Sequence, residues 1–315
     1  MIKSKYLVLS SFYFKFDKNL SKIIEINELF KKQNILDLFR FDKIKIIIEN
    51  EFFENENINF IYLPVSIEKI GGYSFWNCKI QILDLSNCIN LKNIDRFSFK
   101  ENQIKKLKLP KNIEIIGDLA FDGNQMKYLK LPQTIENINE FAFSENQIQI
   151  LDLSNCIKLK NIEGCAFDGN QIKQLKLPKN IEILGRFAFY NNQIEILDLS
   201  NCIKLKIINE DAFFNNLIKQ FKLPKNIEIM NKSVFLKNQI QILDLSNYIK
   251  LKEIKLAVFS ENPLTEIKIL NDIKIEYDKK YMDELWTKFA IYYNYNNKKA
   301  GDYKLENNKW KWYPL

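Results

Sequence analysis

The chain of 315 residues contains no histidine. Without an imidazole it has neither a Ser-His nor a Cys-His catalytic pair, and most transition-metal sites lose a principal ligand. Its five cysteines are odd in number and lack close pairs, which disfavours the dense disulfide framework of small secreted domains and predicts buried, reduced thiols. No apolar run approaches the roughly 20 residues that a transmembrane helix requires.

The first residues imitate an export signal, because Lys3 and Lys5 precede a mostly apolar stretch. No clear small-x-small cleavage site follows, however. The alternation of Phe12, Phe14 and Phe16 with other residues is instead typical of a strand. We therefore predict a cytoplasmic protein, in the host cytoplasm if its source is viral, with a secreted or surface location as the alternative.

A formal net charge of +8 suggests a nucleic-acid partner until it is divided along the chain. Residues 1–34 carry +4 and residues 271–315 carry +2, so the other 236 residues carry only +2. A protein that follows a phosphate backbone concentrates its basic side chains on one face or stripe. The nearly balanced central region therefore argues against a nucleic-acid partner there.

A repeat of 22 or 24 residues runs from about residue 35 to residue 270. We number each unit from an anchor, the second apolar residue of an L-x-L tripeptide. Anchors followed by proline open units of 22 residues, called P-type turns, and anchors followed by serine open units of 24 residues, called S-type turns. With a degenerate first unit, the pattern predicts about eleven turns. The anchors are Leu63, Leu85, Leu109, Leu131, Leu153, Leu177, Leu199, Leu223, Leu245 and Ile269.

A phenylalanine lies ten residues before every anchor, and an asparagine lies seven residues before most of them. Stacked turns would place the phenylalanines, from Phe53 to Phe259, in one buried column. The asparagines, from Asn102 to Asn262, would form a ladder that bonds free backbone groups of neighbouring turns, with Cys78 in the same place of an earlier turn. A row of ligand-binding amides is the alternative interpretation of the asparagines.

These residues resemble the BspA-like leucine-rich repeats of the LRR_5 type, whose units follow L-x-x-I-x-I-P-x-x-V-x-x-I-G-x-x-A-F-x-x-C-x-x-L. Residues 104–124, IKKLKLPKNIEIIGDLAFDGN, are similar to that unit, with asparagine for the usual cysteine. The tail, NNKKAGDYKLENNKW at 296–310, is similar to the ending of spirochaete members. The family also occurs in other bacteria, parasitic protists and giant DNA viruses. The resemblance implies a leucine-rich-repeat solenoid that binds partners and implies no enzyme.

Within each L-x-L strand the middle residue and the residue three before the anchor are predicted to face outward. Lysine and aspartate mostly alternate in the middle row, which predicts ion pairs between turns. The other row places an isoleucine outward in every S-type turn, and an exposed apolar stripe can mark an interaction surface. The candidate partner-binding residues are Tyr62, Ile82, Asp84, Lys108, Tyr128, Lys130, Ile150, Asp152, Lys176, Ile196, Asp198, Lys222, Ile242 and Asp244.

Both ends depart from the repeat, as terminal caps of solenoids do. Residues 1–34 are predicted to form an N-terminal cap of short strands and a helix over 20–33, and residues 35–270 the repeat array. Residues 271–315 are predicted to form a C-terminal cap. There Met282, Leu285, Trp286, Phe289, Ala290 and Tyr293 indicate an amphipathic helix, and a hairpin turning at Asn307 and Asn308 follows.

The fold class predicted from the sequence is a right-handed leucine-rich-repeat solenoid of about eleven turns with one parallel β-sheet and capping ends. Its predicted function is that of a non-catalytic, monomeric protein-interaction scaffold that binds a protein partner through the sheet face. No cofactor is predicted. Cysteines and aspartates that repeat two or three turns apart lie too far from one another to share a metal ion. The alternatives are a nucleic-acid-binding module that uses the basic N-terminus and the Lys/Trp tail, and a secreted or surface adhesin.

Overall fold

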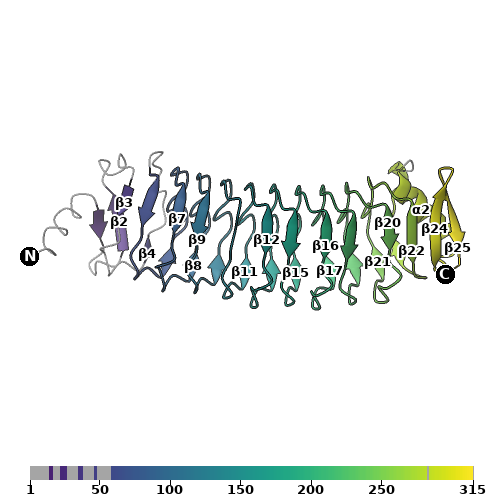
Figure 1. The fold of residues 1–315 in the computed structure, drawn as a ribbon, viewed down its shortest axis with the longest axis horizontal. Coiled ribbons are helices and arrows are strands. Elements are labelled where there is room, and N and C mark those ends of the chain that lie inside the picture. The colour runs from purple at the N-terminus through teal and green to yellow at the C-terminus, as the bar shows by residue number, and fades with distance from the viewer. Residues whose placement is uncertain are drawn as a thin grey trace, which may run out of the picture. The chain divides into compact units, whose positions relative to one another are not determined.

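The computed structural model describes residues 58–281 and 284–314 and, before them, four short strands. The chain forms two compact units, Met1–Ile148 and Gln149–Leu315, which are described one at a time. In each unit short strands recur from turn to turn (Figure 1). The stretch after Lys3 and Lys5 that imitates an export signal, up to residue 13, and Phe53 lie outside the described residues.

The leucine tripeptides form short ladders of parallel strands, which we call together the L-x-L sheet. In the first unit β3 (Ile35–Asp37), β5 (Phe60–Tyr62), β7 (Ile82–Asp84) and β9 (Lys106–Lys108) pair in that order. In the second unit β12 (Ile150–Asp152) pairs with β14 (Gln174–Lys176), and β16 (Ile196–Asp198) pairs with β18 (Gln220–Lys222). β20 (Ile242–Asp244) pairs with β22 (Glu266–Ile269). Most of these strands bury the central leucine and expose the residues on either side, as the period of two requires.

The structure adds a second parallel sheet, the short-strand sheet, to the one that the sequence predicts. In the first unit it contains β4 (Ile46–Ile47), β6 (Lys69–Ile70), β8 (Asn93–Ile94), β10 (Ile115–Ile116) and β11 (Asn137–Ile138). In the second unit β13 (Asn161–Ile162) pairs with β15 (Ile183–Leu184). β17 (Ile207–Ile208), β19 (Ile229–Met230), β21 (Glu253–Ile254) and β23 (Lys274–Ile275) also pair in order. Each of these strands is only two residues long, and from β6 onward its second residue is the one that is buried in the core.

The predicted phenylalanine column is confirmed. Its rings are buried and stack nearly parallel, with centroids 5.2 Å apart for Phe75 and Phe99 in the first unit. In the second unit Phe213 lies 5.5 Å from Phe189 and 5.8 Å from Phe235. One ring per turn therefore packs on the equivalent ring of the next turn, which explains why the sequence never departs from phenylalanine at this position.

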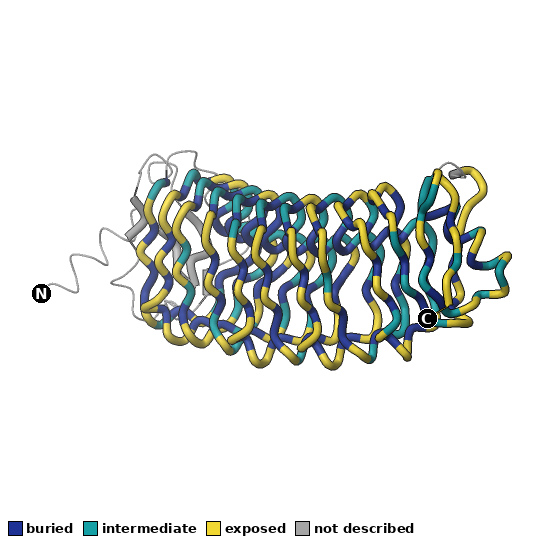
Figure 2. The backbone as a smooth tube through the Cα atoms, turned by 45° about the vertical axis from the view of Figure 1, so that its right-hand side comes forward, coloured by how far each residue is buried: buried dark blue, intermediate teal, exposed yellow. Residues whose placement is uncertain are grey.

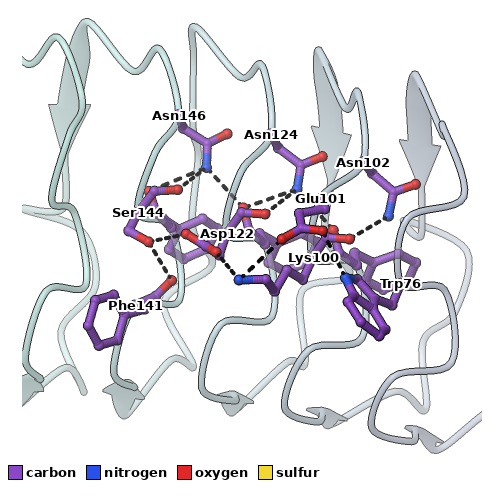
Figure 3. A network of polar contacts seen from close by, with 12 residues as sticks. Trp76, Lys100, Glu101, Asn102, Asp122, Asn124, Phe141, Ser144 and Asn146 are labelled. Carbon is purple, nitrogen blue, oxygen red and sulfur yellow. Dashed lines mark hydrogen bonds and ion pairs between the residues drawn. The ribbon is translucent and has the colours of Figure 1, made fainter. Parts of the chain in front are cut away.

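The asparagine ladder is also confirmed as a structural device. Asn102 accepts a hydrogen bond from the Ile80 backbone N–H at 2.9 Å and donates one to the Phe75 carbonyl at 2.7 Å. Figure 3 shows the bonds that the asparagine amide nitrogens donate. Asn124 and Asn146 repeat this arrangement along the same unit. Each amide satisfies backbone groups that the turn leaves unpaired, and the ladder asparagines are nearly fully buried. The burial of these amides excludes the alternative of a ligand-binding row.

The sequence predicts about eleven turns, which is too many, because the structure forms about nine. The ten anchors from Leu63 to Ile269 enclose nine complete intervals, and the count of eleven includes incomplete turns at both ends. The repeat length of about 24 residues agrees with the sequence.

The N-terminal helix predicted over 20–33 is wrong where the structure describes it. Lys22–Ile26 is a strand, β2, which pairs antiparallel with β1 (Phe14–Phe16) and parallel with β4. Backbone pairing with a neighbouring turn overrides the helical spacing of the apolar residues here. The rest of the predicted helix lies outside the described residues.

The C-terminal helix and hairpin lie where the sequence predicts them. A 3₁₀ turn, η2 (Lys279–Tyr281), precedes helix α2 (Leu285–Tyr295), and β24 (Gly301–Glu306) pairs antiparallel with β25 (Lys309–Tyr313). β24 also pairs antiparallel with β22, so the hairpin covers the last strand of the L-x-L sheet. Trp286 of α2 meets Phe259 edge-on at 5.0 Å and closes the phenylalanine column. Met282 lies outside the described residues.

Candidate functional site: two exposed rows of the solenoid

The structure places most of the predicted partner-binding residues on the exposed side of the L-x-L sheet, whereas Tyr128 and Lys130 are exposed in a turn that forms no strand there. In the second unit Ile196 and Ile242 are 64% and 60% exposed, and Ile150 is also exposed. In the first unit Ile82 and Tyr128 are exposed at the equivalent position, three residues before the anchor, and Tyr62 is exposed at the middle position of its tripeptide. Exposed and buried residues alternate along the described turns of each unit (Figure 2). The charged residues of the set, which are exposed as well, are Asp84, Lys108, Lys130, Asp152, Lys176, Asp198, Lys222 and Asp244.

The lysine–aspartate pairing between turns is present at two steps. Lys108 Nζ lies 2.7 Å from Asp84 Oδ2, and Lys176 Nζ lies 3.6 Å from Asp152 Oδ2. In the last strand, Lys268 instead pairs with Glu266 of its own strand at 3.4 Å. These pairs are exposed, so each contributes about 0–1 kcal/mol to stability.

The aspartates also have a structural role that the sequence did not reveal. Asp152 Oδ1 accepts hydrogen bonds from the backbone N–H of Ser154 at 3.0 Å and from its hydroxyl at 2.5 Å. These two bonds, ahead of the attraction of Lys176, hold the pKa of Asp152 below its ordinary value. The same aspartate–serine turn recurs at Ser86, Ser200 and Ser246. The signal that could have revealed it is the invariant D-L-S of every S-type turn.

A hollow of the L-x-L sheet lies beside Ile242 in the second unit. It has a volume of about 510 Å³ and is lined by Lys219, Gln220, Phe221, Gln239, Gln241, Ile242 and Asp244. β18 and β20, which border it, belong to different ladders among the described strands. Phe221 takes the place of a buried leucine and stacks on Phe235 at 5.0 Å. The hollow thus combines an aromatic floor with amide and charged groups at its rim.

Sequence reasoning missed a second row of exposed isoleucines, one in each S-type turn. These are Ile89, Ile157, Ile203 and Ile249, which lie seven residues after the isoleucines of the first row. They belong to the loop that leads from the L-x-L sheet to the short-strand sheet. The missed signal is the isoleucine of the S-N-C-I motif, which looks like one more core position.

The first unit also contains a polar cluster that breaks the repeat (Figure 3). Lys100 lies 2.7 Å from Asp122 and 3.5 Å from Glu101, and Asp122 accepts a bond from the Ser144 hydroxyl. Trp76 Nε1 donates to Glu101 at 3.2 Å. Burial is the largest single influence and disfavours the charged form of Lys100, but the hydrogen bonds and attraction of Asp122 and Glu101 together outweigh it and raise the pKa of Lys100. Through these paired charges the cluster joins adjacent turns.

Trp310 of the aromatic tail packs inward, whereas Tyr313 is exposed. Trp310 is buried against Phe289, with ring centroids 5.5 Å apart, and its Nε1 donates to the Leu285 carbonyl at 3.1 Å. Trp312 Nε1 donates to the Ala300 carbonyl at 3.0 Å. Bases stack on exposed aromatic faces, so this arrangement favours the capping role of the tail over the nucleic-acid-binding alternative.

All five cysteines are free thiols, and four of them, Cys78, Cys88, Cys156 and Cys202, are buried. Burial, assisted by the nearby aspartates, raises the pKa of Cys88, Cys156 and Cys202 from 9.0 to about 11. Within the described residues no group of three Cys, Asp or Glu side chains could hold a metal ion. None of the helices in that part of the chain has the length and hydropathy of a membrane span.

The buried thiols are expected to be unreactive in the native state. We predict that a Cys165→Ser variant at pH 7 reacts with a thiol reagent about 100-fold more slowly than the same variant in denaturant. The raised pKa of Cys88, Cys156 and Cys202 removes most of their thiolate, and burial blocks access to these three and to Cys78. Absorbance of the released chromophore measures the rate. Rapid modification of one thiol per folded chain would contradict the buried positions.

Comparisons with known proteins agree with this repeat architecture. The sequence profile of the BspA type leucine rich repeat region matches in six copies, over residues 22–149, 92–205 and 160–284. A solved leucine-rich repeat protein from Bacteroides ovatus is 17% identical; the match covers 84% of this chain and 88% of that one, with a TM-score of 0.42. A leucine rich cell surface protein from Faecalibacterium prausnitzii is 14% identical over 86% of this chain and 94% of that one, with a TM-score of 0.35. No curated protein sequence gives a significant match.

Proposed function

The chain belongs to the BspA type leucine-rich repeat family, whose members typically mediate protein interaction or adhesion, and from this premise we propose that it binds a protein partner through its L-x-L sheet. Proteins of this family are generally non-catalytic, and we propose the same for this chain. The cytoplasmic location, the monomeric state and the scaffold role stay predictions from the sequence.

The observation that carries the proposal is the row of exposed isoleucines on rigid strands of the second unit. Ile196 and Ile242 project from strands whose central leucines are buried, so their positions are fixed before a partner arrives. Preorganised apolar side chains lose little conformational entropy on binding. Beside Ile242, the hollow offers a place for one side chain of the partner. We propose that Ile196, Ile242 and this hollow form the centre of the contact.

Replacing Ile150, Ile196 and Ile242 together with serine tests the proposal. We expect recovery of the partner in affinity capture with mass spectrometry to fall at least about tenfold, since burying one isoleucine is worth about 1.5 kcal/mol and 1.4 kcal/mol corresponds to tenfold in affinity. The matched control replaces Ile157, Ile203 and Ile249 with serine, which changes the composition equally in the same turns.

Thermal unfolding of both variants establishes that the array is intact. Equal capture by the wild type and the first variant would overturn the proposal, and loss of capture in the control alone would assign binding to the second isoleucine row.

A further inference from the structure

The second isoleucine row of the second unit is, taken together, more exposed than the first row. Ile157, Ile203 and Ile249 are 57%, 65% and 80% exposed. The backbone beneath them is held in place, because Asn180 Nδ2 donates to the Ile157 carbonyl at 2.8 Å and Asn226 Nδ2 donates to the Ile203 carbonyl at 2.6 Å. These side chains are therefore presented to solvent by an ordered edge.

Lysines surround these isoleucines. The loops from the L-x-L sheet to the short-strand sheet, over 153–162, 177–184, 199–208, 223–230 and 245–254, hold eight lysines and three glutamates, a net charge of +5. The opposite loops, over 163–173, 185–195, 209–219, 231–241 and 255–265, hold six basic and six acidic residues and are neutral. The fold thus gathers positive charge on one edge of a unit whose sequence looks nearly balanced. We call the first set of loops the Ile/Lys edge.

The glutamates of the Ile/Lys edge neutralise part of this charge. Lys204 pairs with Glu182 at 2.8 Å, and Lys252 pairs with Glu228 at 3.0 Å. Lys179 and Lys225, which come from the P-type turns between the isoleucines, have no ion-pair partner among the described residues and are exposed. Cations therefore remain available on both sides of Ile203.

The surroundings of the isoleucines distinguish the kinds of partner that fit. S-type turns alternate with P-type turns in this unit, so successive isoleucines of either row lie about 10 Å apart at the 4.8 Å spacing of parallel strands. The first row stands beside the hollow lined by Phe221 and among aspartates as well as lysines. The second row stands on loops in which lysine is in excess. A nucleic acid gives branched aliphatic side chains nothing to contact along its phosphates. A bilayer with anionic headgroups suits both features, because the tips enter the apolar layer separately while lysines meet phosphate and carboxylate groups.

We propose that the Ile/Lys edge binds the surface of a membrane that contains anionic lipid. Ile157, Ile203 and Ile249 enter the boundary between headgroups and acyl chains, and the neighbouring lysines contact the headgroups. This surface differs from the L-x-L sheet face proposed above for a protein partner, so each can fail without the other.

Sedimentation of the full chain with vesicles tests the membrane proposal. We expect binding to phosphatidylcholine vesicles containing phosphatidylserine, weak binding to phosphatidylcholine alone, and loss of binding at high salt. Replacing Ile157, Ile203 and Ile249 with serine, or Lys179, Lys225 and Lys250 with glutamine, is expected to lower the partition coefficient at least about tenfold. The matched control, with Ile150, Ile196 and Ile242 replaced by serine, is expected to bind as the wild type does.

A labelling experiment gives a second readout that does not depend on triple variants. In a Cys165→Ser background, an environment-sensitive dye on Ile203→Cys should shift to the blue on adding phosphatidylserine vesicles, whereas the dye on Ile196→Cys should not. Equal binding to the two kinds of vesicle, or an equal loss in the control, would overturn the proposal. A third outcome would also overturn it: the lysine variant loses vesicle binding, the Ile157, Ile203, Ile249 variant keeps it, and the wild type binds duplex DNA as well as it binds vesicles. That combination would indicate a site for polyanions in general.

Discussion

Phe213→Ala is expected to lower the free energy of unfolding by about 3–5 kcal/mol, the largest effect of any single substitution considered for this protein. The ring is fully buried and loses its stacking on both Phe189 and Phe235. Its removal opens a cavity that the rigid neighbouring turns cannot fill. The measurement is the midpoint and slope of urea unfolding followed by circular dichroism.

The adjacent residue supplies the control for this experiment. Phe214 is half-buried and stacks on Tyr190 at 5.0 Å at the side of the unit. Phe214→Ala removes the same atoms from a partly solvated place and is expected to cost less than half as much. Similar losses in the two variants would show that the column is not the main source of stability in this turn.

Asn216→Ala is expected to lower the free energy of unfolding by about 2–4 kcal/mol, since it leaves two buried backbone groups without partners at about 1–3 kcal/mol each. Asn216 Oδ1 accepts from the Ile194 N–H at 3.0 Å, and its Nδ2 donates to the Phe189 carbonyl at 2.9 Å. The loss is therefore polar in origin and far exceeds the effect of the few atoms removed. Urea unfolding measures it as above.

Two further variants identify the cause of that loss. Asn201→Ala changes an exposed asparagine in the same turn and is expected to leave stability within about 0.5 kcal/mol of the wild type. Asn216→Asp keeps the acceptor for Ile194 but loses the donor. Burial should raise the pKa of this carboxyl, so the variant should gain stability relative to Asn216→Ala as the pH falls and a donating O–H returns. A pH-independent difference between the two would contradict the role assigned to the amide.

The core of this protein is predictable from the sequence because each turn contacts equivalent positions of its neighbours. A residue type that recurs at one position of every turn, such as phenylalanine ten before the anchor, can only stack on itself. The candidate sheet-face residues follow by the same reasoning, since a strand with buried leucines at every second place exposes the residues between them. The C-terminal helix is predictable from its own periodicity, because α2 packs one apolar stripe.

The Ile/Lys edge was not predictable in this way. Net charge counted along the sequence spreads the lysines of 153–162 and 177–184 over a nearly neutral region. The loops that face in opposite directions alternate along the chain at intervals of about ten residues, so a linear count averages the basic edge with the neutral one. The two edges separate only when the position of each strand is known.

The sequence by itself determined the repeat, the stacking residues and the alternation of buried and exposed positions, because these depend on side-chain pattern alone. The tertiary structure decided the backbone of the turns. From Phe75 to Phe259, the residues two before and two after each column phenylalanine are left-handed. This holds for glycine, as at Gly123, and for other residues, as at Leu119, with φ values of 67° and 54°. Leu119, Phe121 and Gly123 all donate backbone hydrogen bonds to the next turn. These bonds offset the roughly 1–2 kcal/mol that a left-handed residue costs. Their acceptors lie about 21 residues further along the chain, so the local sequence does not predict them.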